Sequence, residues 1–160
     1  MIIIPHLVFG AAIGSLIKNP FLAVAVAFLG HYFLDLIPHN EYSIENIKKK
    51  QWHKAFPDIL KALADFLIGI FLIFIFSGNQ PIVYVCAFFA VLSDGLNLLV
   101  LFYPNKILEA HSNFHHEKIH FLSNKNPADI VGRGGKKISF FLRTSTQITT
   151  VIISIVLMAK

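Results

Sequence analysis

The chain has 160 residues, of which 55% are hydrophobic and only 14% are charged, and its mean hydropathy is +0.64. Soluble domains carry about 25% charged residues, so the composition argues against a soluble protein and predicts an integral membrane protein. The formal net charge is +5 at pH 7. No nucleic-acid-binding motif accompanies this charge, so we expect membrane lipids with anionic headgroups as its partners, and no nucleic acid.

Five apolar segments follow one another and predict a single all-α domain, a polytopic membrane helix bundle over residues 1–160. A transmembrane helix needs about 17–25 apolar residues. The last four segments reach that length, whereas the first could be a tilted span or one arm of a re-entrant hairpin. The first also lacks the features of a signal peptide, so we expect it in the mature protein. The segments are residues 2–17, 20–37, 58–76, 81–103 and 139–158.

Basic residues fall almost entirely on one side of a five-span bundle. Loops 38–57 and 104–138 lie on the side of the N-terminus, whereas the opposite side has only Lys18 and Lys160. Because cytoplasmic loops are enriched in Lys and Arg, this bias predicts a protein of the cell inner membrane with a cytoplasmic N-terminus. The two loops contain Lys48, Lys49, Lys50, Lys54, Lys106, Lys118, Lys125, Arg133, Lys136 and Lys137.

Polar residues in the first segment and in the loop after the second indicate how the helices sit. His6 shares a helix face with Gly10 and Gly14, a G-x-x-x-G pair that favours close helix packing, so we expect His6 to face another helix. Residues 41–56 combine apolar side chains with lysines and predict a short amphipathic helix lying on the cytoplasmic surface of the membrane. Trp52 is expected to anchor that surface.

The second segment ends in the sequence GHYFLDLIPH, residues 30–39. Positions i, i+4 and i+8 share one face of a helix, so His31, Asp35 and, if the helix continues past Pro38, His39 form a polar stripe. Ionisable groups at membrane depth are costly and usually face a bundle interior. Imidazole and carboxylate groups are also typical ligands of a hydrolytic metal ion. These three residues are therefore candidate metal ligands.

Two further carboxylates fall at the same depth in the third and fourth segments. Asp65 lies about two turns into its segment, at 1.5 Å per residue, and Asp94 lies in the cytoplasmic half of its own. Either is a candidate catalytic general base. The alternative for Asp65 is a charge stripe with Asp58 and Lys61 at the start of the helix. Arg143, in the fifth segment, is expected to be an interfacial anchor rather than a phosphate ligand.

The second cytoplasmic loop contains four histidines within ten residues, from His111 to His120. If this stretch is helical, His111 and His115 share one face, and His116 and His120 share an adjacent one. Clustered histidines are typical of metal sites, so His111, His115 and His116 are candidate ligands. An equally weighted alternative is a solvated helix beside the membrane whose histidines are merely polar.

The motifs His6-x-x-x-Gly10 and Gly30-His31-x-x-x-Asp35 resemble two motifs of the predicted membrane-bound metal-dependent hydrolases, a family of multi-pass bacterial and archaeal inner-membrane proteins. The resemblance implies that His6, His31 and Asp35 are metal ligands. It covers only part of the chain, because the L-P-D-x-D-H and H-R-G-x-T-H-S stretches of that family are absent here in those forms.

Three functions remain open at this point. The first is a metal-dependent hydrolase that acts on a lipid ester or phosphodiester at the cytoplasmic leaflet. Zn or Mn is the expected metal, and a bound water is the expected nucleophile. The second is an ion or proton transporter that uses the same His and Asp residues, although the outer half of the bundle has almost no ionisable residues. The third is a non-catalytic membrane scaffold whose polar layer fixes helix packing.

Overall fold

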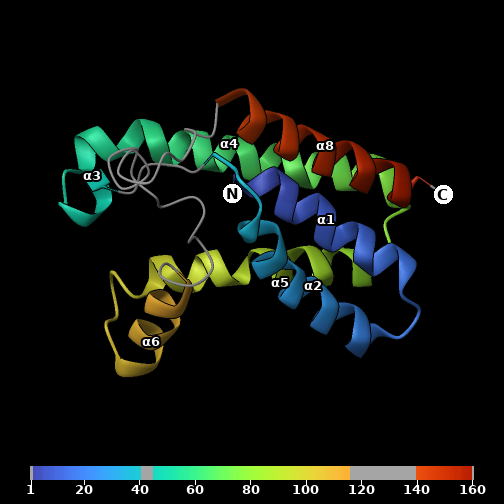
Figure 1. The fold of residues 1–160 in the computed structure, drawn as a ribbon, viewed down its shortest axis with the longest axis horizontal. Helices are drawn as coiled ribbons and strands as arrows, with labels where there is room; N and C mark the ends of the chain where they lie inside the picture. The colour runs from blue at the N-terminus through green and yellow to red at the C-terminus, as the bar shows by residue number, and fades with distance from the viewer. Residues whose placement is uncertain (1, 41–44, 116–139, 160) are drawn as a thin grey trace, which may run out of the picture.

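The computed structural model describes residues 2–40, 45–115 and 140–159, and in this part of the chain all regular structure is helical, which confirms the predicted all-α fold. The five long helices are grouped into a bundle, and the short helices α3 and α6 lie at one end of it (Figure 1). The helices are α1 (Ile3–Leu16), α2 (Pro20–Leu36), α3 (Glu45–Lys48), α4 (Trp52–Phe76), α5 (Pro81–Leu99), α6 (Lys106–Phe114) and α8 (Phe140–Met158).

Three of these helices, α4, α5 and α8, are long and apolar enough to cross a membrane, so the chain is a membrane protein. The other two apolar segments also form helices, but α1 has 14 residues and α2 has 17. The predicted count of five spans is therefore not confirmed. Large apolar side chains on the long helices are exposed, for example Phe71 at 61%, Phe88 at 57% and Ile152 at 56%. Surrounding lipid would account for this surface, since water would not favour it.

Helix α1 lies at the centre and packs against α2, α4, α5 and α8. Its approach to α5 is close because glycine removes a side chain from the contact. A Cβ atom at Gly10 would lie only 2.6 Å from the Ala90 Cβ and 2.6 Å from the carbonyl oxygen of Cys86. A Cβ atom at Gly14 would likewise lie only 2.9 Å from the Cα of Val83. The predicted use of this G-x-x-x-G pair in helix packing is confirmed.

The ends of α2 and α4 differ from the predicted boundaries. Helix α2 stops at Leu36, and Ile37 is extended with φ −81° and ψ 139°, because a residue that precedes proline disfavours the helical conformation. The helix therefore does not continue past Pro38, as a single stripe through His39 would need. Helix α4 begins at Trp52 rather than at residue 58, so the predicted surface helix over 41–56 is reduced to α3 in the described part of that segment.

Candidate metal centre

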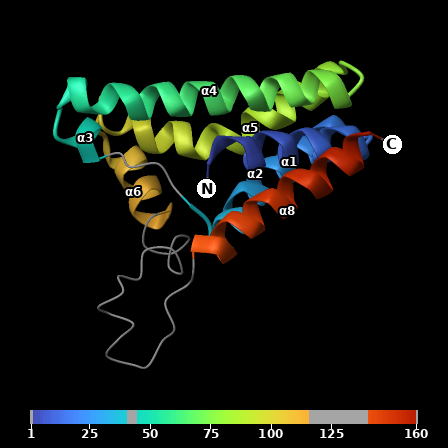
Figure 2. The ribbon, with the colours of Figure 1, turned by 90° about the horizontal axis from the view of Figure 1, so that it is seen from above.

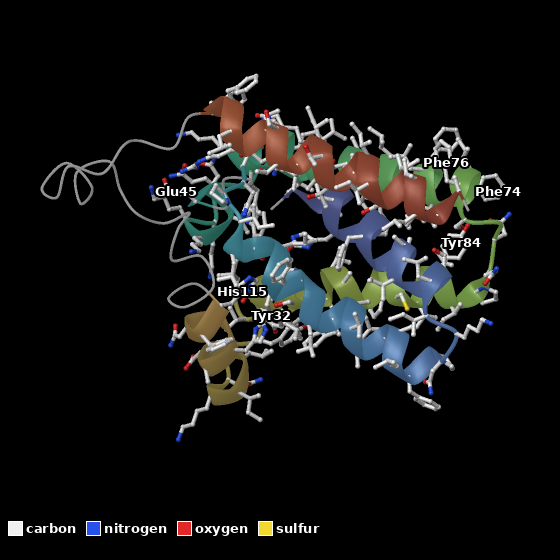
Figure 3. The ribbon with its side chains drawn as sticks, turned by 45° about the vertical axis from the view of Figure 1, so that its right-hand side comes forward. Tyr32, Glu45, Phe74, Phe76, Tyr84 and His115 are labelled. Atoms are coloured by element: carbon white, nitrogen blue, oxygen red, sulfur yellow. The ribbon has the colours of Figure 1, made fainter. Side chains whose placement is uncertain are left out.

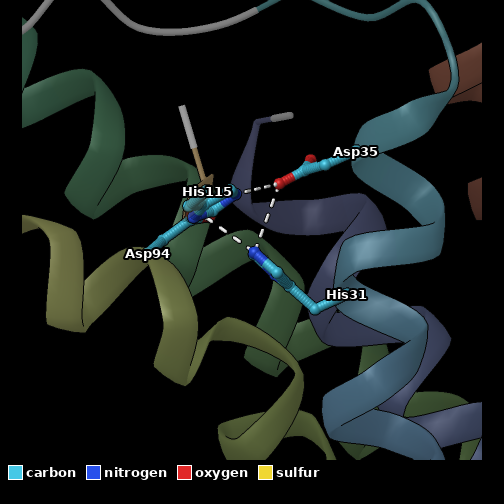
Figure 4. Close-up of side chains that lie close together, drawn as sticks. All are labelled: His31, Asp35, Asp94 and His115. Carbon is cyan, nitrogen blue, oxygen red and sulfur yellow. Dashed lines mark hydrogen bonds and ion pairs between the residues drawn. The ribbon is translucent and has the colours of Figure 1, made fainter. Parts of the chain in front are cut away.

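Four side chains from α2, α5 and the end of α6 converge at one end of the bundle. His31 and Asp35 come from α2, Asp94 from α5, and His115 from the position directly after α6 (Figure 4). One ligand atom from each lies within 4.8 Å of all the others. The side chains of His31, Asp35 and His115 are fully buried, whereas that of Asp94 is 33% exposed. This buried group could hold a metal ion. We call it the His/Asp group.

Asp35 is the residue of the group with the most contacts, because four imidazoles surround its carboxylate. Its Oδ2 atom is 2.9 Å from His115 Nε2 and 3.2 Å from His31 Nε2. Its Oδ1 atom is 3.1 Å from His6 Nε2 and 3.7 Å from His39 Nε2. Removing an ionised carboxylate from water is unfavourable unless it is paired. The four surrounding imidazoles, or a metal cation, provide that pairing.

The hydrogen bond made by its Nδ1 atom determines the tautomer of His31. Its Nδ1 atom is 2.8 Å from the carbonyl oxygen of Ala90, and a carbonyl oxygen only accepts, so Nδ1–H is the donor. The neutral ring then has a lone pair on Nε2, which has no hydrogen-bond partner in the described structure. That atom lies 3.2 Å from Asp35 Oδ2 and 3.7 Å from Asp94 Oδ1. A proton on Nε2 or on a carboxylate, or a cation held between these atoms, would offset their repulsion.

His115 is oriented by two polar residues of α5. Its Nδ1 atom lies 3.3 Å from Ser93 Oγ and also contacts the Asn97 amide. With the Asn97 N–H donating to Nδ1, the proton of His115 is on Nε2 and is donated to Asp35. The buried Oδ1 of Asn97 then lacks a hydrogen-bond partner. Rotating the amide by half a turn makes Nδ1 the donor, which leaves the Nε2 lone pair for a metal.

His39 reaches Asp35 from the extended chain that follows α2. Its Nδ1–H donates to the Ile37 carbonyl at 2.6 Å, so its Nε2 is the atom that faces Asp35. Helix α8 holds this segment in place on both sides of His39. Thr146 donates to the Pro38 carbonyl at 2.6 Å, and Gln147 donates to the Asn40 carbonyl at 2.9 Å. The last apolar helix therefore supports the centre without contributing a ligand.

His111 lies beside the His/Asp group but is not part of it. Its Nε2 atom is 3.0 Å from the Tyr32 hydroxyl and 3.2 Å from Ser93 Oγ. Burial lowers the pKa of the His111 imidazole, neighbouring His115 and His31 lower it further, and Asp94 opposes them. The ring is therefore neutral at pH 7.

Tyr32 and His115 lie close together at the same end of the molecule, with ring centroids 5.6 Å apart, whereas Phe74, Phe76 and Tyr84 lie at the opposite end (Figure 3).

Asp65, a predicted candidate for the general base, caps a helix in the structure. Its Oδ2 atom accepts hydrogen bonds from the backbone N–H of Ile3 at 2.6 Å and of Ile4 at 3.1 Å. These N–H groups belong to the first turn of α1 and have no carbonyl partner within the helix. The side chain of the residue just before a helix usually accepts from such groups. Asp65 thus caps α1 from α4, and it is not one of the residues of the His/Asp group.

We expect Asp65→Ala to lower the free energy of unfolding by about 0.5–2 kcal/mol, the usual cost of losing a helix cap. Bound metal should be unchanged. Asp65→Asn keeps an acceptor oxygen and should recover most of the stability. Denaturant unfolding in detergent and metal content per chain measure both effects. If Asp65→Asn had normal stability but no turnover, that result would support the predicted role of Asp65 as general base.

The structure therefore brings most of the predicted site residues together. His31, Asp35, Asp94 and His115 converge on one position, His6 and His39 contact Asp35 beside it, and His111 lies next to the group. Asp65 lies elsewhere, and His116 is outside the described residues. Tyr32 was not predicted; its only signal in the sequence is its position directly after His31. Ser93 and Asn97 flank Asp94 on one side of a predicted helix, but their hydrogen bonds to His115 could not be read from that pattern.

Comparison of the chain with models of protein families, with curated proteins and with solved structures gave no match. The fold and the site alone therefore define the class: an all-helical membrane protein with a buried group of two histidines and two aspartates that could hold a metal ion.

Proposed function

We propose that this protein is a metal-dependent hydrolase of the inner membrane that acts on a lipid ester or phosphodiester at the cytoplasmic leaflet. The observation that carries the proposal is the orientation of His31. Its Nδ1–H is bound to the Ala90 carbonyl, so its Nε2 lone pair faces two carboxylates in a buried position. Histidines that bind a metal usually donate their other ring N–H to a carbonyl or carboxylate, which fixes the tautomer as the Ala90 carbonyl does here.

The donor set favours a divalent transition metal. Two imidazoles and two carboxylates suit Zn or Mn better than Ca, which prefers oxygen ligands alone. The two carboxylate charges of Asp35 and Asp94 would balance the charge of a divalent ion. A neutral assembly is important here because an unbalanced charge in a buried site is strongly unfavourable.

The four residues divide into a buried and an accessible set. His31, Asp35 and His115 are fully buried, and they would hold the ion together with Asp94. Asp94 is partly exposed, so its second carboxylate oxygen could orient a water molecule. A bound divalent metal lowers the pKa of its water and so supplies a nucleophile at neutral pH. His111 and Tyr32 lie at the edge of the same group, where their polar atoms could contact a substrate.

The choice of substrate and leaflet rests on the position of the centre. It lies at the end of the bundle where α4 begins and α5 ends, which is the membrane boundary if these helices span. Lys48, Lys49, Lys50, Lys54 and Lys106 belong to the segments at this end. The excess of lysine favours the cytoplasmic side and anionic lipid headgroups. The resemblance to the membrane-bound metal-dependent hydrolases supports the same reaction class.

The test is metal content followed by turnover. Protein purified without added metal should contain Zn or Mn close to one ion per chain. It should hydrolyse a phospholipid or a chromogenic phosphodiester or ester, a chelator should abolish turnover, and the metal should restore it. A metal content at background would overturn the proposal. Bound metal without hydrolysis of any of these substrates would also overturn it, in favour of a transporter or a scaffold.

A further inference from the structure

Helix α6 carries a metal-ligand candidate on one face and a largely exposed apolar stripe on another. One residue of that stripe, Phe114, contacts Tyr32 edge to face, with ring centroids 6.3 Å apart. Leu108 and His111 are partly buried and His115 is fully buried, and these residues face α5 and α2. Ile107 is 83% exposed and Phe114 is 53% exposed. These two residues and Ala110 are spaced i, i+3 and i+7, so they lie on one face of the helix. We call Ile107, Ala110 and Phe114 the α6 stripe.

The α6 stripe lies close to the level at which the long apolar helices end. Helix α5 ends at Leu99, only seven residues before α6 begins, and the connection exposes Phe102 and Tyr103. Trp52, at the first turn of α4, stacks on Phe102 with ring centroids 6.4 Å apart. Aromatic side chains collect at the boundary between membrane and water. Figures 1 and 2 both show α6 at this end, to the side of the bundle.

The charges at this end fit a negatively charged surface. Four lysines precede or begin α4, and Lys106 begins α6, whereas the only described lysine at the opposite end is Lys18. Each basic residue near an anionic bilayer contributes about 1 kcal/mol of attraction. Apolar stripe, aromatic residues and lysines together are the features of a helix that lies in the headgroup region.

We propose that the α6 stripe is seated in the headgroup region of an anionic bilayer, and that this contact holds His115 against Asp35. Metal affinity would then depend on the bilayer. Within the described residues the backbone of α6 packs mainly against α5, and its contacts with α2 are made by His111, Phe114 and His115 alone, so a contact with the bilayer would add to a small set. His115 is also the one member of the His/Asp group that does not come from a long apolar helix. The inference rests on the proposed function, because it assumes that the group binds metal.

Zn²⁺ affinity, measured by competition with a chromophoric chelator, tests the coupling. The wild type should bind Zn²⁺ at least about tenfold more tightly in nanodiscs of phosphatidylcholine with phosphatidylglycerol than in detergent, in line with the loss of a supporting contact outside the ligand shell. Ile107→Glu and Phe114→Glu should abolish most of this difference. Asn113→Glu, on the exposed polar face of the same helix, is the matched control and should keep it.

A fluorescence measurement reports the position of α6 independently of metal. Trp52 is the only tryptophan, so Trp52→Phe provides a background for Ile107→Trp and for Asn113→Trp. Lipids brominated near the headgroup should quench the fluorescence of a tryptophan at position 107 and leave that of a tryptophan at position 113 unquenched. Equal quenching at both positions, or quenching at 107 with metal affinity unaffected by Ile107→Glu, would overturn the inference and leave the metal centre intact. A wild type without metal in either medium would instead overturn the proposed function.

Discussion

Asp35→Ala is expected to remove bound metal while the helices remain inserted in the membrane. Asp35 contacts His6, His31, His39 and His115, and it would supply both a ligand and half of the balancing charge. Loss of a residue that merely supports a ligand weakens metal binding by about 10–100-fold, so loss of the central ligand should exceed that range. Asp35→Asn should behave in the same way, because the amide keeps the size of the side chain but not its charge. Metal per chain after purification measures the effect.

Asp58→Ala is the matched control for this experiment. Asp58 lies on α4, where its carboxylate pairs with Lys61 at 3.3 Å, and it is outside the His/Asp group. Its removal should leave metal content unchanged, because surface ion pairs of this kind contribute little to stability. If Asp35→Ala and Asp58→Ala retained equal amounts of metal, the centre described here would not be the binding site.

Asn97→Ala is expected to weaken metal binding by about 10–100-fold without removing any ligand. Asn97 contacts Nδ1 of His115 and therefore determines which ring nitrogen carries the proton. Asn97→Asp is the informative partner, because a carboxylate only accepts and so keeps the proton on Nδ1. It should retain the affinity that Asn97→Ala loses. Titration of the purified variants with Zn²⁺ in the presence of a chelator gives the dissociation constants.

The control for Asn97 is Asn113→Ala, which truncates an exposed residue of α6 and should have no effect on affinity. If Asn97 only filled space beside His115, Asn97→Asp should lower the metal affinity as much as Asn97→Ala does, because the new carboxylate adds a charge next to a buried imidazole. Recovery of affinity in Asn97→Asp therefore separates control of the tautomer from simple packing. Equal losses in the two variants would show that Asn97 does not act through His115.

The part of the centre that lies on one helix was predictable from the sequence, whereas the part that joins distant segments was not. His31 and Asp35 are four residues apart in an apolar helix, so their common face follows from helical geometry. His115 is 80 residues from Asp35, and its contact depends on how α6 folds back against α5. The capping of Ile3 and Ile4 by Asp65 spans a similar separation. Spacing along a chain carries no information about such contacts.

The helices themselves were predicted more accurately than their ends. All five apolar segments form helices. In an apolar environment, the N–H and carbonyl groups of a single segment can be hydrogen-bonded within that segment only if it is helical. The ends depend on local effects such as Pro38, which stops α2 at Leu36, and on the first turns of α4, which extend to Trp52. Hydropathy alone does not detect those turns, since His53 and Lys54 make them look like part of a loop.

Ala90 takes part in two different kinds of contact, and this links the apolar interior of the bundle to its chemistry. Its Cβ atom faces the glycine of α1 at position 10, and its carbonyl oxygen accepts a hydrogen bond from His31 Nδ1–H. A bulkier residue at Gly10 would push α5 outward and withdraw the carbonyl that sets the basicity of the imidazole. If the His/Asp group binds metal, selection for that binding would therefore also select for glycine at position 10, a residue outside the group.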